Sequence, residues 1–151
     1  MNTRATELKN KYEFINLVLP FEFSPFIPEF DDGIDFILHR ERDNVHLNIQ
    51  LKSRWLVDRK YFGRSIWIAF PDNAEPKRNW YLAPHDLMVA HGQMKFAQSK
   101  SWADGVYHRA APAAGWQSEY AGYRVDVILA KEKTELQTKT GYATDWMKSE
   151  K

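Results

Sequence analysis

Two neighbouring segments in the first half of the chain alternate between apolar and polar residues, the pattern of a half-buried β-hairpin. Residues 34–40 and 45–53 both show this period of two, and a turn around Asp43 and Asn44 separates them. A helix cannot hold such a pattern on one face, because its side chains repeat every ~3.6 residues. We therefore expect two paired antiparallel strands here, and their register decides which side chains meet.

A two-residue loop at Asp43 and Asn44 would give cross-strand partners whose residue numbers sum to 87. The partners predicted in this way are Phe36 with Leu51, Leu38 with Ile49, Asp35 with Lys52, and Ile37 with Gln50. The first two pairs form an apolar face and the last two lie on the opposite face. Because the Cβ atoms of partners lie ~4.5–5.5 Å apart, Asp35, Gln50 and Lys52 are expected to converge on one polar patch.

The rest of the chain predicts helices and strands around this hairpin. The expected elements are a helix over 1–19, an edge strand within 20–32, strands over 65–70 and 79–83, a helix over 84–91, a further strand at 106–107, and a helix over 116–127. Residues 1–137 are expected to form a single domain, followed by a polar tail over 138–151. The predicted fold class is α/β, with a mixed, largely antiparallel central sheet flanked by helices.

Composition excludes several classes of function. The 151 residues include no cysteine, so disulfides, zinc–thiolate sites, iron–sulfur clusters and cysteine nucleophiles are excluded. The formal net charge of +1 argues against a broadly basic nucleic-acid binder. Neither a signal-peptide pattern nor an apolar run long enough to cross a membrane is present, so we expect a soluble, cytoplasmic protein.

The polar patch on the hairpin has the residue types of a magnesium site. A carboxylate at Asp35 and an amide oxygen at Gln50 are hard oxygen ligands, and Lys52 beside them could position a water molecule or offset charge on a phosphate. Because Gln50 is uncharged, a further carboxylate is desirable. Glu7 and Glu13 on the first helix are candidates, and Glu13 is our choice. The alternative is an ordinary cross-strand ion pair between Asp35 and Lys52 on a solvated strand face.

The same residues resemble the core motif of the PD-(D/E)XK nuclease superfamily, which has a restriction-endonuclease-like fold. The motif is an aspartate at the start of one strand and a (Glu/Gln)-x-Lys on the next, which Asp35 and the segment 50–52 match. The resemblance implies that Asp35 and Gln50 bind Mg²⁺ (with Mn²⁺ as a substitute), that Lys52 is catalytic, and that Glu13 is the helix-borne glutamate. This chain differs from the motif at Gln50, which is not acidic, and at Pro28, which lies seven residues before Asp35.

The segment 52–64, here called the basic loop, directly follows the motif and carries a local excess of positive charge. Five of its six charged residues are cationic, including the four that we expect to hold a phosphate backbone: Arg54, Arg59, Lys60 and Arg64. The alternative is a solvated loop without a ligand.

These observations predict a Mg²⁺-dependent DNA endonuclease, expected to be a homodimer or higher homo-oligomer because cutting both strands needs two sites. The alternative is a catalytically silent nucleic-acid-binding or assembly module on the same scaffold. None of the five histidines shows the spacing of a known zinc motif, and His39 is expected to be a surface residue.

Overall fold

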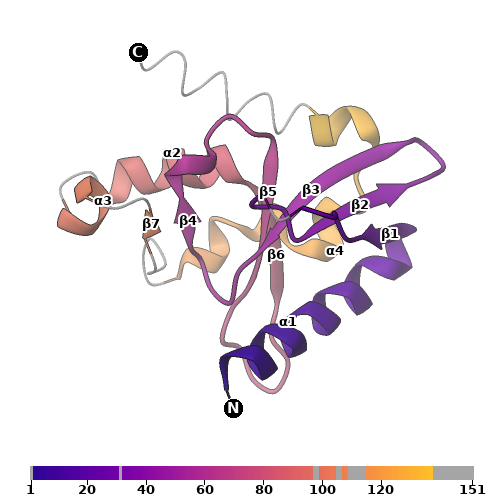
Figure 1. Ribbon diagram of the computed structural model, residues 1–151, viewed down its shortest axis with the longest axis horizontal. Helices are drawn as coiled ribbons and strands as arrows, with labels where there is room; N and C mark the ends of the chain where they lie inside the picture. Colours follow the sequence, from indigo (N-terminus) through magenta and orange to yellow (C-terminus); the bar gives the residue numbers. More distant parts are fainter. Residues whose placement is uncertain (1, 31, 97–98, 105–106, 109–114, 138–151) are drawn as a thin grey trace.

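A five-stranded sheet in the order β1–β2–β3–β5–β6 organises the protein (Figure 1). The computed structural model describes residues 2–30, 32–96, 99–104, 107–108 and 115–137. The strands are β1 (Phe23–Phe26), β2 (Phe36–Arg40), β3 (Val45–Leu51), β5 (Ile66–Pro71) and β6 (Trp80–Pro84). β3 and β5 run parallel and the other neighbours antiparallel. A separate two-stranded pair joins β4 (Val57–Asp58) to β7 (Tyr107–His108).

Helices flank the sheet, so the predicted α/β class with a mixed, mostly antiparallel sheet is confirmed. The α-helices are α1 (Thr3–Val18), α2 (His85–Phe96), α3 (Lys100–Asp104) and α4 (Val125–Ile128). Short 3-10 turns are η1 (Leu19–Phe21), η2 (Arg59–Tyr61), η3 (Trp116–Ser118) and η4 (Ala121–Tyr123). No helix in the described part of the chain is long and apolar enough to cross a membrane.

The period-two pattern of the strands divides the core into two layers. On one face of the sheet, Phe36 and Leu38 of β2 pack with Phe14 of α1 and Ile128 of α4. On the other face, residues of β5 and β6 pack with Met88 of α2 and Trp102 of α3. Figure 1 shows α1 and α2 on opposite sides of the strands. All six residues of β5 are buried, as expected for a central strand covered on both faces.

The hairpin register differs from the prediction by two residues. Phe36 pairs with Ile49, and Ile37 pairs with Asn48, so partner numbers sum to 85 and the loop contains the four residues 41–44. A two-residue shift keeps every side chain on its predicted face, because the pattern repeats every two residues. The predicted partnership of Asp35 with Lys52, however, is wrong.

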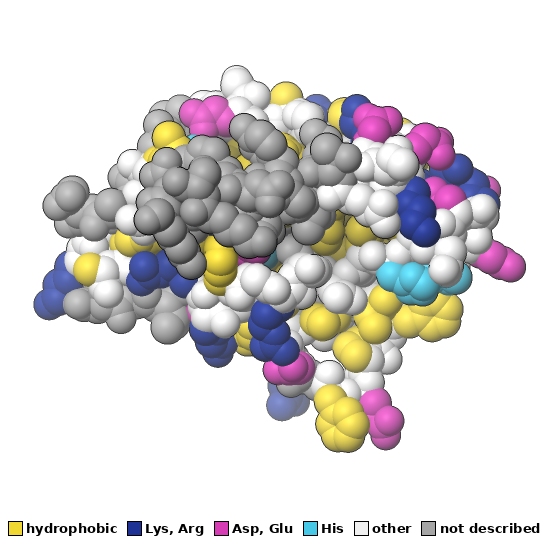
Figure 2. All heavy atoms as spheres, turned by 90° about the horizontal axis from the view of Figure 1, so that it is seen from above, with side chains coloured by type: hydrophobic (Ala, Val, Ile, Leu, Met, Phe, Trp, Pro, Cys, Tyr) yellow, Lys and Arg dark blue, Asp and Glu magenta, His cyan; other side chains and the backbone are white. Residues whose placement is uncertain are grey.

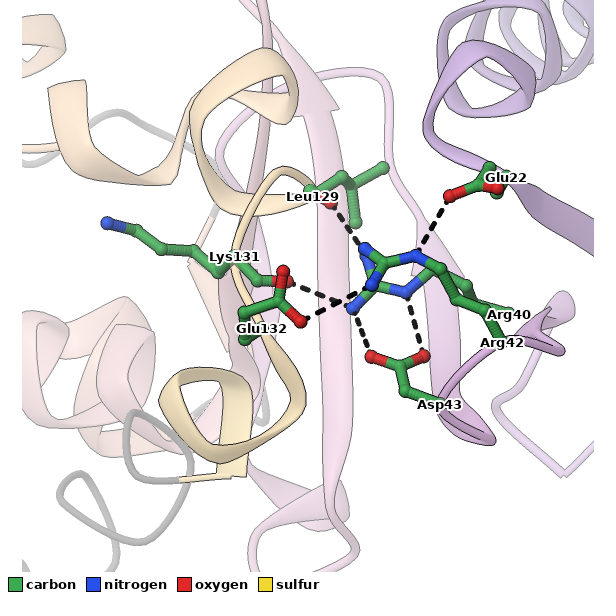
Figure 3. A network of polar contacts seen from close by, with 7 residues as sticks. All are labelled: Glu22, Arg40, Arg42, Asp43, Leu129, Lys131 and Glu132. Carbon is green, nitrogen blue, oxygen red and sulfur yellow. Dashed lines mark hydrogen bonds and ion pairs between the residues drawn. The ribbon is translucent and has the colours of Figure 1, made fainter.

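Arg40 explains the longer loop. Its side chain is fully buried and lies over the Phe23 ring, where a guanidinium group needs hydrogen-bond acceptors. Arg40 Nε and Nη2 donate to the carboxylate of Asp43 at 2.9 and 2.8 Å, so the loop must turn Asp43 back towards the strand (Figure 3). Arg40 also donates to the backbone carbonyls of Leu129 and Lys131 at 3.0 and 2.9 Å. The turn is therefore fixed by the segment after α4.

The predicted helix over 116–127 is also wrong. The segment forms η3, η4 and the one-turn helix α4, and Arg124 between the last two has an extended backbone with ψ 144°. The aromatic residues that suggested a helical stripe pack individually on the sheet: the Trp116 ring lies 4.9 Å from Tyr81, and the Tyr120 ring lies 5.9 Å from Phe70. Tertiary packing of large rings thus outweighs the local periodicity.

Candidate active site

The N-terminal half of α1 and the adjoining ends of β2 and β3 enclose an open cavity of about 670 Å³. This volume falls within the range of small-molecule sites, ~300–1,000 Å³, and is large enough for a nucleotide unit. Its lining residues are Thr3, Thr6, Glu7, Asn10 and Lys11 from α1, and Asp35, Phe36, Leu51, Lys52 and Ser53 from the strand ends. The structure therefore places two predicted site residues, Asp35 and Lys52, in one cavity.

Asp35 is held by the backbone of β3. Its own N–H donates to the Ile49 carbonyl at 2.8 Å, and its Oδ2 accepts the Leu51 N–H at 2.7 Å. The side chain is exposed on the cavity side. An ionised carboxylate has two acceptor oxygens with about four lone-pair sites, so the Leu51 N–H does not use all that Asp35 can accept. The backbone of β3 thus fixes both the main chain and the carboxylate of Asp35, although this residue precedes β2.

Lys52 lies at the point where the chain leaves the sheet. Its N–H donates to the Ala69 carbonyl of β5 at 2.8 Å, which continues the parallel pairing one residue beyond β3. The side chain is half-buried and lines the cavity together with Asp35. The parallel pairing with β5 therefore fixes the direction in which this lysine leaves the sheet.

Gln50 does not line this cavity, although the next residue, Leu51, does, because the Gln50 side chain is turned into the interior. The residue is only 3% exposed, and its Nε2 donates to the Gly33 carbonyl at 3.0 Å, two residues before Asp35. Its Oε1 is buried and has no hydrogen-bond partner among the described residues. An orphaned buried acceptor is costly, about 1–3 kcal/mol, so this oxygen has the chemistry of a ligand for a cation or a water molecule.

Glu13 does not reach the cavity. Its carboxylate accepts hydrogen bonds from Arg78 at 2.6 and 3.2 Å and from Trp80 Nε1 at 2.8 Å. Burial by itself would raise the pKa of Glu13, but the Arg78 and Trp80 hydrogen bonds and the Arg78 charge outweigh it and lower that pKa. The prediction of Glu13 as a ligand is not supported by this placement, since the carboxylate is occupied by a structural ion pair.

The helix-borne acidic residue in the cavity is Glu7. Glu13 follows Glu7 by six positions, a spacing that turns a helix by ~600°, or ~240° beyond one full turn, so the two carboxylates point in different directions. Thr3, Glu7 and Asn10 are spaced by four and three residues and form a polar stripe on α1. The spacing of these polar residues in the sequence indicates which side of α1 faces the cavity. The apolar spacing of α1 does not show this.

Charges of both signs line the cavity. Lys11 and Lys52 face the same space as Glu7 and Asp35. Lys11 Nζ also lies 5.9 Å from the centre of the Phe36 ring, which holds it beside the cavity floor. Such a mixed lining fits a ligand that brings both a metal ion and an anionic phosphate, and it does not fit an uncharged apolar ligand.

Apart from Lys52, the cations of the basic loop do not form one patch towards the cavity. Arg59 lies over the Trp102 ring and donates to the Trp102 carbonyl, while Arg64 pairs with Asp32. Lys60 lies 3.7 Å from Asp58, and Arg54 lines a separate cavity of about 420 Å³ beside Trp116. The structure therefore distributes Arg54, Arg59, Lys60 and Arg64 over different surroundings.

His85 and Asp86 fasten the basic loop to the start of α2. His85 Nε2 lies 2.6 Å from the Asp58 carbonyl oxygen, and Nδ1 lies 3.0 Å from Asp86 Oδ1. Asp86 in turn accepts the Gly63 N–H at 3.1 and 3.2 Å. His85 is fully buried, so these contacts are structural and hold residues 58–63 against α2.

The described residues supply only some of the ligands that a magnesium ion needs. Among the described residues, no three His, Asp or Glu side chains gather closely enough to hold a metal ion. Asp35 and Glu7 bring carboxylates to the cavity, whereas the unpartnered amide oxygen of Gln50 is buried outside the cavity lining. This donor set fits Mg²⁺, which takes one or two carboxylates and keeps most of its waters for a phosphate to replace.

The chain was compared with protein-family models, curated proteins and solved structures, and none of them matches it.

Proposed function

We propose that this protein is a Mg²⁺-dependent phosphodiester hydrolase that acts on DNA, with its active site in the cavity between α1 and the ends of β2 and β3. The observation that carries this proposal is the placement of Asp35 and Lys52 in one cavity. Gln50, whose buried Oε1 is unpartnered, lies two residues before Lys52 in the chain. The resemblance of these residues to the nuclease motif supports the same assignment.

Mg²⁺ would be held by Asp35, with Glu7 as an outer carboxylate that orders bound water; the buried Gln50 side chain would have to turn out of the interior to add its amide oxygen. When bound, the ion would lower the pKa of a water molecule and neutralise charge on the phosphate. The hydrogen bond from the Leu51 N–H holds Asp35 at 2.7 Å and keeps the carboxylate in one orientation. Gln50 contributes no charge, so Asp35 supplies the anionic character of the site.

Lys52 would donate hydrogen bonds to a phosphate oxygen or orient the attacking water, and its positive charge offsets the charge that develops on the phosphate. Lys11, on the facing helix, is suited to a flanking phosphate group. Both lysines line the cavity, so the phosphate would lie between α1 and the sheet.

The experiment is cleavage of supercoiled plasmid in Mg²⁺ or Mn²⁺ by the wild type and by Lys52→Ala and Asp35→Asn. We expect cleavage by the wild type and a loss of at least ~100-fold in each variant. Lys131→Ala is the matched control, because Lys131 is another half-buried lysine outside the cavity and pairs with Glu135 at 3.5 Å. Equal cleavage by wild type and Lys52→Ala would refute the proposal.

The products also test the expected homodimer or higher homo-oligomer. A chain that acts as a dimer with two active sites should convert plasmid to the linear form, whereas a single site should accumulate nicked circles. Mass measurement in solution at the same protein concentration gives the oligomeric state independently.

The second candidate function is a catalytically silent nucleic-acid-binding or assembly module. The inward-turned, neutral Gln50 and the internally paired basic-loop cations favour it. Salt-dependent DNA binding without cleavage, together with no Mg²⁺-dependent rise in melting temperature, would support this candidate over the enzyme.

A further inference from the structure

His39 of β2 and His46 of β3 are direct cross-strand partners, and their side chains share the sheet face opposite α1. The two rings stack with centroids 4.3 Å apart and an angle of 16° between their planes. Ser24 of β1 pairs with His39 from the other side, so Ser24, His39 and His46 form one row across three strands. The corrected register is what brings the two histidines together.

This part of the sheet face is open in the described structure. His46 is exposed and His39 half-buried, while α2 and α3 cover the face at β5 and β6. Phe26, next to His39 with its ring 6.3 Å away, is 55% exposed. Figure 2 shows histidine side chains at the surface beside exposed hydrophobic groups. The imidazole groups are therefore accessible to a small ion.

A second contact fixes which nitrogen of His39 carries a proton. His39 Nε2 lies 3.1 Å from Asn44 Oδ1, and an amide oxygen can only accept a hydrogen bond. Nε2 is thus the donor, so the neutral ring has its lone pair on Nδ1. A histidine that binds a metal usually donates its other ring N–H to an oxygen acceptor in this way. Asn44 is held in place by the turn, where it adopts a left-handed conformation with φ 55°.

We propose that His39 and His46 form a binding site for a divalent late transition-metal ion of the Zn²⁺, Ni²⁺ and Cu²⁺ group. Imidazole nitrogen is a preferred ligand for these ions, whereas Mg²⁺ prefers oxygen. Cross-strand partners have Cβ atoms ~4.5–5.5 Å apart, a spacing that two imidazoles can bridge through one ion. Water, or the Ser24 hydroxyl at the end of the row, would complete the coordination.

The stacked rings must move for binding. Nearly parallel rings cannot direct both lone pairs at one ion, because a metal lies close to the plane of each imidazole that binds it. His46 is exposed and is able to rotate, while His39 keeps its hydrogen bond to Asn44. Metal binding is therefore expected to abolish the ring stacking.

The site is tested by titrating the full chain, without a polyhistidine tag, with Zn²⁺ and with Cu²⁺ in a buffer that does not bind metals. We expect one ion per chain that excess Mg²⁺ does not displace, and a Cu²⁺ electron paramagnetic resonance spectrum with two nitrogen ligands. His39→Gln and His46→Gln should each weaken binding roughly tenfold or more, because the second ligand of the chelate is lost. Asn44→Ala should weaken it about tenfold while leaving both imidazoles in place.

Two control variants separate this site from other metal-binding groups. Asp35→Asn should leave Zn²⁺ affinity unchanged, since the site is independent of the proposed Mg²⁺ site. His91→Gln removes a histidine elsewhere, and it should also leave affinity unchanged once circular dichroism shows that it is folded. Unchanged affinity in the His39→Gln/His46→Gln double variant, or no wild-type binding with a Kd below ~1 mM, would overturn the proposal.

Discussion

Arg40 and Asp43 form a two-point ion pair inside the β2–β3 hairpin, with Nε–Oδ1 and Nη2–Oδ2 distances of 2.9 and 2.8 Å. The Arg40 side chain is 1% exposed and that of Asp43 18%. The hydrogen bonds from Arg40, and then its charge, lower the pKa of Asp43. The pair closes the four-residue loop and so sets the register that places Asp35 beside the end of β3.

Replacing Arg40 with methionine should destabilise the protein by about 2–4 kcal/mol. The variant keeps an apolar side chain over Phe23 but removes the donors to Asp43, Leu129 and Lys131. Urea unfolding followed by tryptophan fluorescence measures the loss. Arg42→Met is the matched control: Arg42 forms ion pairs with Glu22 and Glu132 at the surface, and its removal should cost much less. Equal losses in both variants would contradict the structural role of Arg40.

Glu13→Gln should destabilise the protein by about 1–2 kcal/mol at neutral pH while leaving DNA cleavage unchanged. The variant weakens the hydrogen bonds from Arg78 and Trp80 but does not touch the cavity. A loss of cleavage in a folded Glu13→Gln protein would instead restore Glu13 as an active-site residue.

The Glu13 contribution should also depend on pH. Because its pKa is lowered from 4.5 in the folded state, the ionised carboxylate stabilises the fold fully above pH 4.5. The stabilisation is lost as the pH falls through the folded-state pKa. The difference in unfolding free energy between wild type and Glu13→Gln should therefore shrink on going from pH 7 to pH 3. A difference that stays constant over this range would argue against the ion pair with Arg78.

Gly33→Ala should be strongly destabilising. Gly33 has φ 82°, and a Cβ there would overlap the Tyr61 ring. The Gly33 carbonyl also accepts the hydrogen bond of Gln50 Nε2, so the change disturbs the position of that amide. Gly63→Ala is the control, since Gly63 has a similar φ of 84° but nothing within 4 Å of a Cβ. The difference in melting temperature between the two variants measures the destabilisation caused by the overlap of the new Cβ with the Tyr61 ring. Equal melting temperatures would show that this overlap does not occur.

DNA binding should depend more on the cavity lysines, Lys11 and Lys52, than on the other cations of the basic loop. Lys11 and Lys52 line the cavity, whereas Arg64 is engaged by Asp32 and the Tyr61 ring. Fluorescence anisotropy against salt concentration should show a slope smaller by ~0.9 for each lost phosphate contact in Lys11→Ala and Lys52→Ala. Arg64→Ala should change the slope little. A larger change in slope for Arg64→Ala than for the two lysine variants would instead indicate that the basic loop makes the phosphate contacts.

The elements of the fold were predictable because their signals are local. The alternation in β2 and β3, the apolar run of β5 and the helical spacing of α1 all lie within single segments. The register was not predictable, because it depends on hydrogen bonds from Arg40 to carbonyls 89 and 91 residues further along the chain. The sequence of the turn is compatible with a two-residue loop, and only the hydrogen bonds of the buried Arg40 guanidinium exclude it.

The candidate site was predictable in part for the same reason. Asp35 and Lys52 are fixed by strand ends that the alternation locates, so their shared cavity follows from the hairpin. The choice between Glu7 and Glu13 depends on the rotation of α1 about its axis. That rotation is set by the contacts of Phe14 and Val18 with the sheet, and Arg78 then engages Glu13. The His39–His46 contact likewise required the correct register.

The contact between Arg40 and the segment after α4 has a consequence for synthesis of the protein on the ribosome. Residue 131 is translated 91 residues after residue 40, a delay of roughly 5–18 s at ~5–20 residues per second. Throughout that interval the nascent hairpin has an arginine whose final carbonyl partners do not yet exist. The buried Arg40 can therefore have its full set of hydrogen bonds only after residue 131 has been synthesised and has left the ribosomal tunnel, well after the last strand of the sheet, β6.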